Sequence, residues 1–162
     1  MPVLKGGVIS PDTWLNVATD DTLPKEGAII VGLGRWLAER DELLKRNTAL
    51  GVRIEPGDDL TKIRDDIARF DVIAVVFPRF RDGRGFSIGR LLRERYGFKG
   101  ELRALGDILR DQFLFLHRCG YDAIEVKENM PLDEWHTAMN EFSVWYQPTA
   151  DGRQSVLRRR HK

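Results

Sequence analysis

A short segment rich in arginine and glycine is the part of the sequence best suited to bind an anionic group. It reads Arg79-Phe80-Arg81-Asp82-Gly83-Arg84-Gly85 and follows an apolar run that is typical of a strand. Glycine lets a backbone turn tightly and expose its N–H groups, and a helix N-terminus adds positive potential. Arginine binds carboxylate, sulfate or phosphate through paired hydrogen bonds. We therefore predict a site for a small anion or an acidic partner; the alternative is a solvated loop whose charges pair locally.

The charged and polar residues around this segment extend the candidate site. Between positions 79 and 118, ten lysines and arginines stand against five acidic residues, although the net charge of the whole chain is only +1. Asp82 and Asp107 are expected to orient the guanidinium groups, and Asp107 is also expected to cap the helix that follows it. The candidate anion- or partner-binding residues are Arg79, Arg81, Asp82, Arg84, Ser87, Arg90, Arg103 and Asp107.

A second motif resembles part of a dinucleotide-binding fingerprint. Gly32 and Gly34 follow an apolar run, and Glu55 stands about where an acidic residue would bind a ribose. The motif is incomplete, because Leu37 occupies the place of the third glycine and Arg35 would crowd a pyrophosphate. The pattern indicates either a nicotinamide or flavin site at these residues or a tight turn between a strand and a helix.

The elements that must position these residues follow from hydrophobic periodicity. Strands are predicted at 28–33, 52–54, 71–77, 102–105 and 123–126, and helices at 35–46, 60–70, 86–96, 108–119 and 131–142. This alternation predicts right-handed βαβ units and a parallel sheet. We expect an α/β fold with an open parallel five-stranded sheet and helices on both faces. A partial (β/α) barrel is the alternative, since five units cannot close an eight-stranded barrel.

In either fold, the loops at the carboxyl ends of the parallel strands form the edge of the site. These loops are predicted at 33–35, 55–58, 78–86, 105–107 and 127–130. The arginine-rich loop and Asp107 are therefore expected on the same rim of the sheet.

The chain divides into three segments by composition. We expect an irregular N-terminal arm at 1–27 packed on the domain, a single α/β domain at 28–146, and a mobile basic tail at 147–162. The N-terminus has no long apolar run of the kind found in signal peptides, and the other apolar runs are too short to span a membrane.

The few cysteine and histidine residues limit the kinds of disulfide, metal site and catalytic site that the chain can form. Cys119 is the only cysteine, so an internal disulfide is excluded and a cytoplasmic location is expected. No spacing of cysteine and histidine suggests a zinc or iron–sulfur site, and no catalytic triad is visible. Cys119 falls at a predicted helix C-terminus, which disfavours a thiolate, and is interpreted as a small buried hydrophobe. A balanced net charge argues against nucleic acid as a partner.

The central part of the sequence resembles a known family. The residues that carry the resemblance are Phe77-Pro78-Arg79-Phe80, Asp82-Gly83-Arg84-Gly85, Ser87, Arg90-Leu91-Leu92, Gly100-Glu101-Leu102-Arg103-Ala104, Gly106-Asp107, Asp111-Gln112 and Arg118-Cys119-Gly120. In these positions the chain is similar to the bacterial family known as domain of unknown function 934. The resemblance implies a link to assimilatory sulfite reduction, as an accessory whose gene neighbours that of a sulfite reductase haemoprotein.

The sequence is therefore compatible with three alternative functions. The first is a non-catalytic accessory of sulfite reduction that docks an acidic partner, such as the haemoprotein or its electron donor, through the arginine-rich rim. The second is an oxidoreductase of the same pathway that uses a nicotinamide or flavin cofactor. The third is a binder of a small sulfur oxyanion or a sulfonucleotide, which requires a concave site.

Overall fold

A computed structural model describes residues 1–128 and 130–160 of the chain, so the expected loop 127–130 and tail 147–162 lie partly outside the described residues. Within these residues, eight strands form one sheet in the order β2-β1-β8-β7-β6-β5-β4-β3. The strands are β1 (Val3–Lys5), β2 (Val8–Ser10), β3 (Leu15–Val17), β4 (Ile29–Gly32), β5 (Leu50–Ile54), β6 (Val72–Phe77), β7 (Glu101–Gly106) and β8 (Ala123–Glu125). Strands β3 to β8 are parallel, and β1 pairs antiparallel with β2 and β8.

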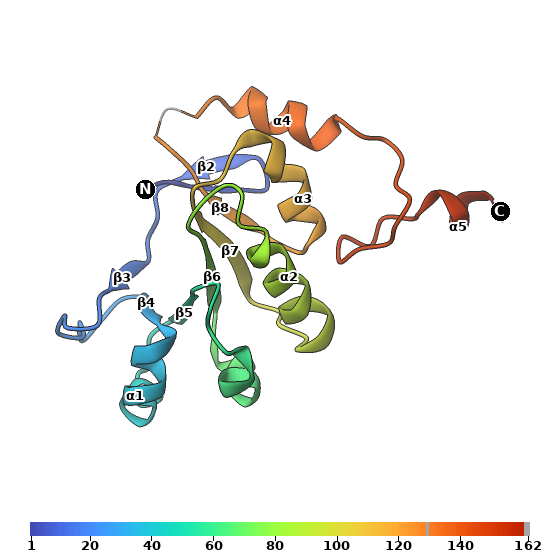
Figure 1. Ribbon diagram of the computed structural model, residues 1–162. Coiled ribbons are helices and arrows are strands. Elements are labelled where there is room, and N and C mark those ends of the chain that lie inside the picture. Colours follow the sequence, from blue (N-terminus) through green and yellow to red (C-terminus); the bar gives the residue numbers. More distant parts are fainter. Residues whose placement is uncertain (129, 161–162) are drawn as a thin grey trace.

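Helical segments follow most of the parallel strands. They are α1 (Leu33–Leu43), the 3₁₀ helix η1 (Leu60–Arg69), α2 (Arg84–Arg90) continued by the π-helical turn η2 (Leu91–Arg95), the 3₁₀ turn η3 (Arg110–Gln112), α3 (Phe113–Arg118), α4 (Leu132–Asn140) and α5 (Val156–Arg160). The curled sheet forms the inner layer, and the helices from α1 to α4 lie around its outside (Figure 1).

The helices cover one face of the sheet, so the expectation of helices on both faces was wrong. Each parallel strand from β4 to β8 lies beside the strand that precedes it in the chain. Right-handed crossovers that always step in the same direction place every helix on the same face. The described residues accordingly form one large core cluster that contains the buried helical side chains, and a small cluster on the other face built from strands and Trp14. The expected alternative, a partial (β/α) barrel, is confirmed.

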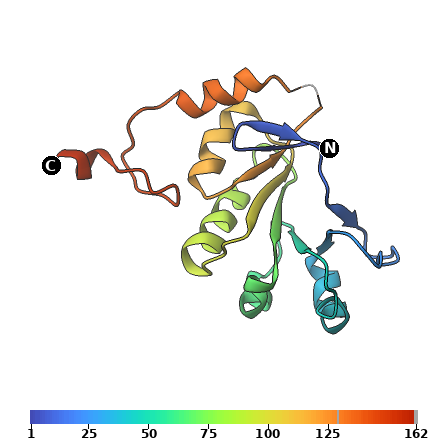
Figure 2. The ribbon, with the colours of Figure 1, turned by 180° about the vertical axis from the view of Figure 1, so that it is seen from behind.

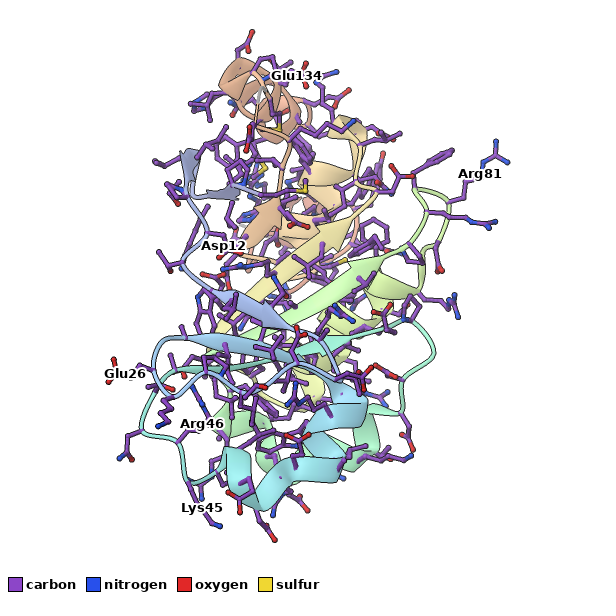
Figure 3. The ribbon with its side chains drawn as sticks, turned by 90° about the vertical axis from the view of Figure 1, so that its left-hand side faces the viewer. Asp12, Glu26, Lys45, Arg46, Arg81 and Glu134 are labelled. Carbon is purple, nitrogen blue, oxygen red and sulfur yellow. The ribbon has the colours of Figure 1, made fainter. Side chains whose placement is uncertain are left out.

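The sequence had suggested an irregular N-terminal arm, but the arm contains three short strands. It contributes the β1–β2 hairpin to one edge of the sheet and β3 to the other, which raises the expected five strands to eight. Between β2 and β3 the chain crosses the concave face, where Asp12 is seen in front of the strands (Figure 3). Trp14 packs there against the cluster that includes Ile30 and Val72. These strands are three residues long, too short for periodicity to reveal them.

The segment beyond α4 runs away from the body of the domain, and α5 lies on the side of the molecule opposite the N-terminus (Figure 2). Part of it is nevertheless held by α3. The Arg118 guanidinium lies 3.9 Å from the centroid of the Trp145 ring, and its Nε is 3.3 Å from Asp151 Oδ2. Trp145 and Ser155 are buried. Mobility of the tail from residue 147 stays a prediction.

Helix α2 packs so closely that two of its positions require glycine. A methyl group on Gly85 would lie 2.3 Å from the Phe77 ring, and one on Gly89 would lie 2.4 Å from the Tyr121 ring. The Tyr121 hydroxyl also donates a buried hydrogen bond of 2.6 Å to the Gly85 carbonyl. The two glycines thus hold α2, and the arginine-rich loop before it, against the sheet.

We expect Gly85→Ala to lower the free energy of unfolding by about 2 kcal/mol, since the methyl group forces the buried Phe77 ring to move. Gly34→Ala in α1 is the matched control: a methyl group there meets nothing within 4 Å, and the change should raise stability by about 0.5 kcal/mol. Urea denaturation of the two variants and the parent measures the difference. Equal stability of both variants would contradict the close packing of α2.

Candidate functional site

The arginine-rich loop lies where the parallel sheet was expected to place it. It follows β6, whose neighbour β7 ends beside it with Phe77 and Gly106 in register. The backbone N–H of Asp107 donates to the Phe77 carbonyl at 2.8 Å. Asp107 Oδ2 accepts a hydrogen bond of 3.1 Å from the Phe80 N–H. The loop and Asp107 therefore share the carboxyl rim of the sheet, and Asp107 fixes the loop through its backbone.

Two expectations about Asp107 were wrong. It does not cap the helix after β7, because the chain stays non-helical until η3, whose N-cap is Leu109. Its carboxylate also forms no ion pair with the arginines of the loop among the residues that the structure describes; it bonds to the Phe80 N–H instead. The backbone turns at Gly106, at the end of β7, and Ile108 and Leu109 separate Asp107 from the helical segment.

Gln112 holds the same loop from the other side. Its Nε2 donates to the Phe80 carbonyl at 2.8 Å, and its Oε1 accepts from the Leu109 N–H at 3.0 Å. The side chain is buried, so both bonds are shielded from water. Phe80 thus has both backbone groups bonded to fixed partners. The sequence did not reveal this role of Gln112; the one signal for a buried amide there is a polar residue directly before the apolar run 113–116.

Asp82 and Arg84 bind each other. Arg84 Nε lies 2.9 Å from Asp82 Oδ1 and Arg84 Nη2 lies 2.6 Å from Asp82 Oδ2, which is a two-point ion pair. The hydrogen bond from Arg84 lowers the pKa of the Asp82 carboxyl to about 2. The Asp82–Arg84 pair therefore supports the alternative of a loop whose charges pair locally, and Arg84 is not left free to bind a ligand.

The groove beside Arg84 is not electropositive. It has a volume of about 340 Å³, lies between η1 and α2, and is also lined by Ser87, Asp58 and Asp59. Asp59 caps η1 by accepting from the Thr61 N–H at 3.0 Å. Two carboxylates in the lining would oppose an anion, so the groove is poorly suited to sulfite or sulfate.

The two predicted arginines outside the loop, Arg90 and Arg103, are also paired. Arg90 Nε lies 3.1 Å from Glu94 Oε1, one turn further along the helix. Arg103 points to the concave face and not to the loop. Its Nη2 lies 2.8 Å from Glu101 Oε1 and its Nη1 lies 2.8 Å from Asp12 Oδ1, and only 4% of its side chain is exposed. Arg103 therefore belongs to a buried ionic network that ties the N-terminal arm to the sheet.

Arg79 and Arg81 are the arginines of the loop that remain available. Neither guanidinium forms an ion pair with residues 1–128 or 130–160; the pairs near the loop involve Arg84 and Arg90. The Arg81 guanidinium lies 5.3 Å from the centroid of the Phe80 ring. Arg81 points away from the body of the molecule (Figure 3). Of the eight predicted site residues, the structure thus leaves two arginines that are both exposed and unpaired among the described residues, on a loop held by Asp107.

The glycine motif has the position, but not the surroundings, of a dinucleotide site. Gly32 ends β4, next to the strand whose end carries Glu55. Gly32 and Gly34 have ordinary backbone angles, and Gly34 lies inside α1. The Glu55 carboxylate lies 3.3 Å from Arg53 Nε. The nicotinamide or flavin site stays a prediction.

The remaining titratable groups show no activated nucleophile in the part of the chain that the structure describes. Burial raises the pKa of the Cys119 thiol, so little thiolate is present near neutral pH. Burial lowers the pKa of His117. Residues 1–128 and 130–160 contain no group of three metal-binding side chains, and none of their helices has the length and apolar character needed to cross a membrane.

The fold and the site together define the class of protein: a curled β/α half-barrel with helices on its outer face and a fixed, arginine-bearing loop on its carboxyl rim. The chain belongs to the family described as bacterial protein of unknown function (DUF934), whose family model matches residues 51–157. The matched part contains β6 to β8, all of β5 except Leu50, and the whole of the loop. A comparison with curated proteins finds no match.

Proposed function

We propose that the protein is a non-catalytic accessory of bacterial assimilatory sulfite reduction, and that it docks an acidic protein partner through the arginine-rich loop. The observation that carries the docking is the pair of exposed, unpaired guanidinium groups of Arg79 and Arg81 on a loop whose backbone is bonded at Phe80 to Asp107 and Gln112. The pathway rests on the family resemblance, which points to the sulfite reductase haemoprotein or its electron donor as the partner.

Docking fits the loop better than capture of a small anion. A small anion requires several donors that converge in a concave site. Arg84 and Arg90 are paired with carboxylates of their own segment, and Arg103 is buried on the other side of the sheet. Arg79 and Arg81 instead present charge on an exposed loop, which suits the steering of a protein with an acidic surface.

We expect the double variant Arg79→Glu/Arg81→Glu to bind the haemoprotein at least about tenfold more weakly than the parent at low salt, since two attractive charges become repulsive. Affinity of the parent should fall as salt rises, because exposed charges are screened. Binding of the full chain to the immobilised haemoprotein and, separately, to its electron donor, across a salt series, measures both effects.

The matched control is Lys25→Glu/Lys99→Glu, which changes the net charge by the same amount. These exposed residues precede β4 and β7 and therefore lie at the amino ends of the strands. Glu26, the neighbour of Lys25, is on the opposite side of the molecule from Arg81 (Figure 3). If both double variants lose affinity equally, or neither does, the loop is not the docking surface.

A further inference from the structure

The two residues whose backbones bond to the Gln112 carboxamide, Phe80 and Leu109, both have exposed apolar side chains. Gln112 bonds to the backbone of both Phe80 and Leu109, so these residues lie on either side of one buried group. Their side chains are nevertheless turned to solvent: Phe80 is 43% exposed and Leu109 is 45% exposed. We call this pair the Phe80–Leu109 patch.

The patch is bordered by positive charge. Arg79 and Arg81 flank Phe80 in the chain, and Arg110 follows Leu109; all three are exposed. Interfaces are commonly organised in this way, with an apolar centre, enriched in aromatic residues, inside a polar border. The border also contains the carboxylates of Asp107 and Asp111. Interleaved carboxylates would repel a continuous phosphate backbone or an anionic membrane, whereas a protein surface can match a mixed pattern.

The backbone of Phe80 is ordered before any partner arrives. Its N–H is bonded to Asp107 and its carbonyl to Gln112, and the Phe77 ring packs against Gly85 behind the loop. A rigid aromatic side chain on an ordered backbone loses little conformational freedom on binding, so more of the interaction energy appears as affinity. Aromatic residues with these properties are typical energetic centres of interfaces.

We propose that Phe80 is the apolar anchor of the docking surface, and that the partner presents an apolar socket bordered by carboxylates. This inference rests on the proposed docking function and specifies the kind of partner surface. Arg79, Arg81 and Arg110 attract and orient the partner, whereas Phe80, supported by Leu109, holds it once bound. Asp107 and Gln112 act as positioning residues that present Phe80.

Because the arginines and Phe80 have different roles, their variants should change different rate constants of binding. Phe80→Ala should accelerate dissociation of the haemoprotein about tenfold or more, with the salt dependence of association unchanged. Arg79→Glu/Arg81→Glu should instead slow association and reduce its salt dependence. An unchanged salt dependence in Phe80→Ala also excludes an indirect effect through the stacked Arg81. Surface plasmon resonance with the full chain, at several salt concentrations, measures both rates.

Phe142→Ala is the matched control, since Phe142 is 50% exposed and lies beyond α4, outside the loop and the rim. The haemoprotein should dissociate from Phe142→Ala at the same rate as from the parent. Parent-like dissociation of Phe80→Ala, or equal acceleration by Phe142→Ala, overturns the anchor and leaves the docking function standing. Failure of the parent to bind either the haemoprotein or its electron donor overturns the docking function itself, and the anchor with it.

Discussion

Gly106→Ala is expected to lower the free energy of unfolding by about 3 kcal/mol, the largest effect of any added methyl group that we propose. Gly106 has a φ of 102°, which residues with a side chain rarely adopt. A methyl group there would also lie 2.4 Å from the Phe77 carbonyl oxygen, which is backbone and cannot rotate away. That carbonyl accepts the hydrogen bond of Asp107, so the same change should loosen the rim. Urea denaturation measures the loss.

Gly97→Ala separates the two causes. Gly97 also has a positive φ, of 67°, but a methyl group there meets nothing within 4 Å. It should therefore cost only the backbone strain, about 1–2 kcal/mol. Equal losses in the two variants would show that the strands move apart at Gly106 without cost, contrary to the tight pairing of β6 and β7.

Arg103→Met is expected to lower the free energy of unfolding by about 3 kcal/mol near neutral pH. Arg103 is buried, and its removal leaves the carboxylates of Glu101 and Asp12 under the N-terminal arm without their shared cation. Lys5 still pairs with Glu101 at 2.8 Å, but its side chain is mostly exposed. The control is Arg53→Met, at the position in register with Arg103 two strands away on β5, where the side chain is exposed; it should change stability by less than about 0.5 kcal/mol.

The loss in Arg103→Met should depend on pH. Burial alone would raise the pKa of Glu101, but hydrogen bonds from Lys5 and Arg103 outweigh it and lower the pKa below the ordinary value of 4.5. Because the folded pKa is the lower one, the carboxylate stabilises the fold fully above the unfolded pKa, and this stability is lost as pH falls through the folded value. The variant lacks the guanidinium, so its deficit relative to the parent should shrink in acid.

Two measurements complete this test: denaturation of parent and variant between neutral pH and pH values below 4.5, and the double variant Glu101→Gln/Arg103→Met at neutral pH. Removing the orphaned charge should restore part of the lost stability. A deficit that is constant with pH, or a double variant less stable than Arg103→Met, would show that Arg103 contributes by packing and not by charge.

The sequence by itself determined the parallel elements and the edge on which the loop lies. Continuous apolar runs mark strands buried on both faces, so the strand expected at 71–77 is β6 (Val72–Phe77). The carboxyl ends of parallel strands meet at one edge, so the arginine-rich loop and Asp107 had to share a rim. These inferences use only local patterns and a rule of handedness, and both hold.

The direction of each crossover was decided by tertiary structure. Every βα unit has the same local pattern whether the next strand is added to the left or to the right of the last one. Periodicity therefore cannot distinguish a doubly wound sheet from a half-barrel. The strands of the N-terminal arm were hidden for a related reason: three-residue strands are too short to show alternation, and β1 pairs with β8, which lies more than a hundred residues away in the chain.

Tertiary structure also decided which arginines are exposed and unpaired. Arg79, Arg84 and Arg103 cannot be distinguished by residue type, and each has a carboxylate within three residues in the sequence. Only the packed fold pairs Arg84 with Asp82 and buries Arg103 beneath the arm with Glu101. Side-chain pairing depends on distances of a few ångströms between elements, because the interaction of charges weakens rapidly with separation and with solvent screening.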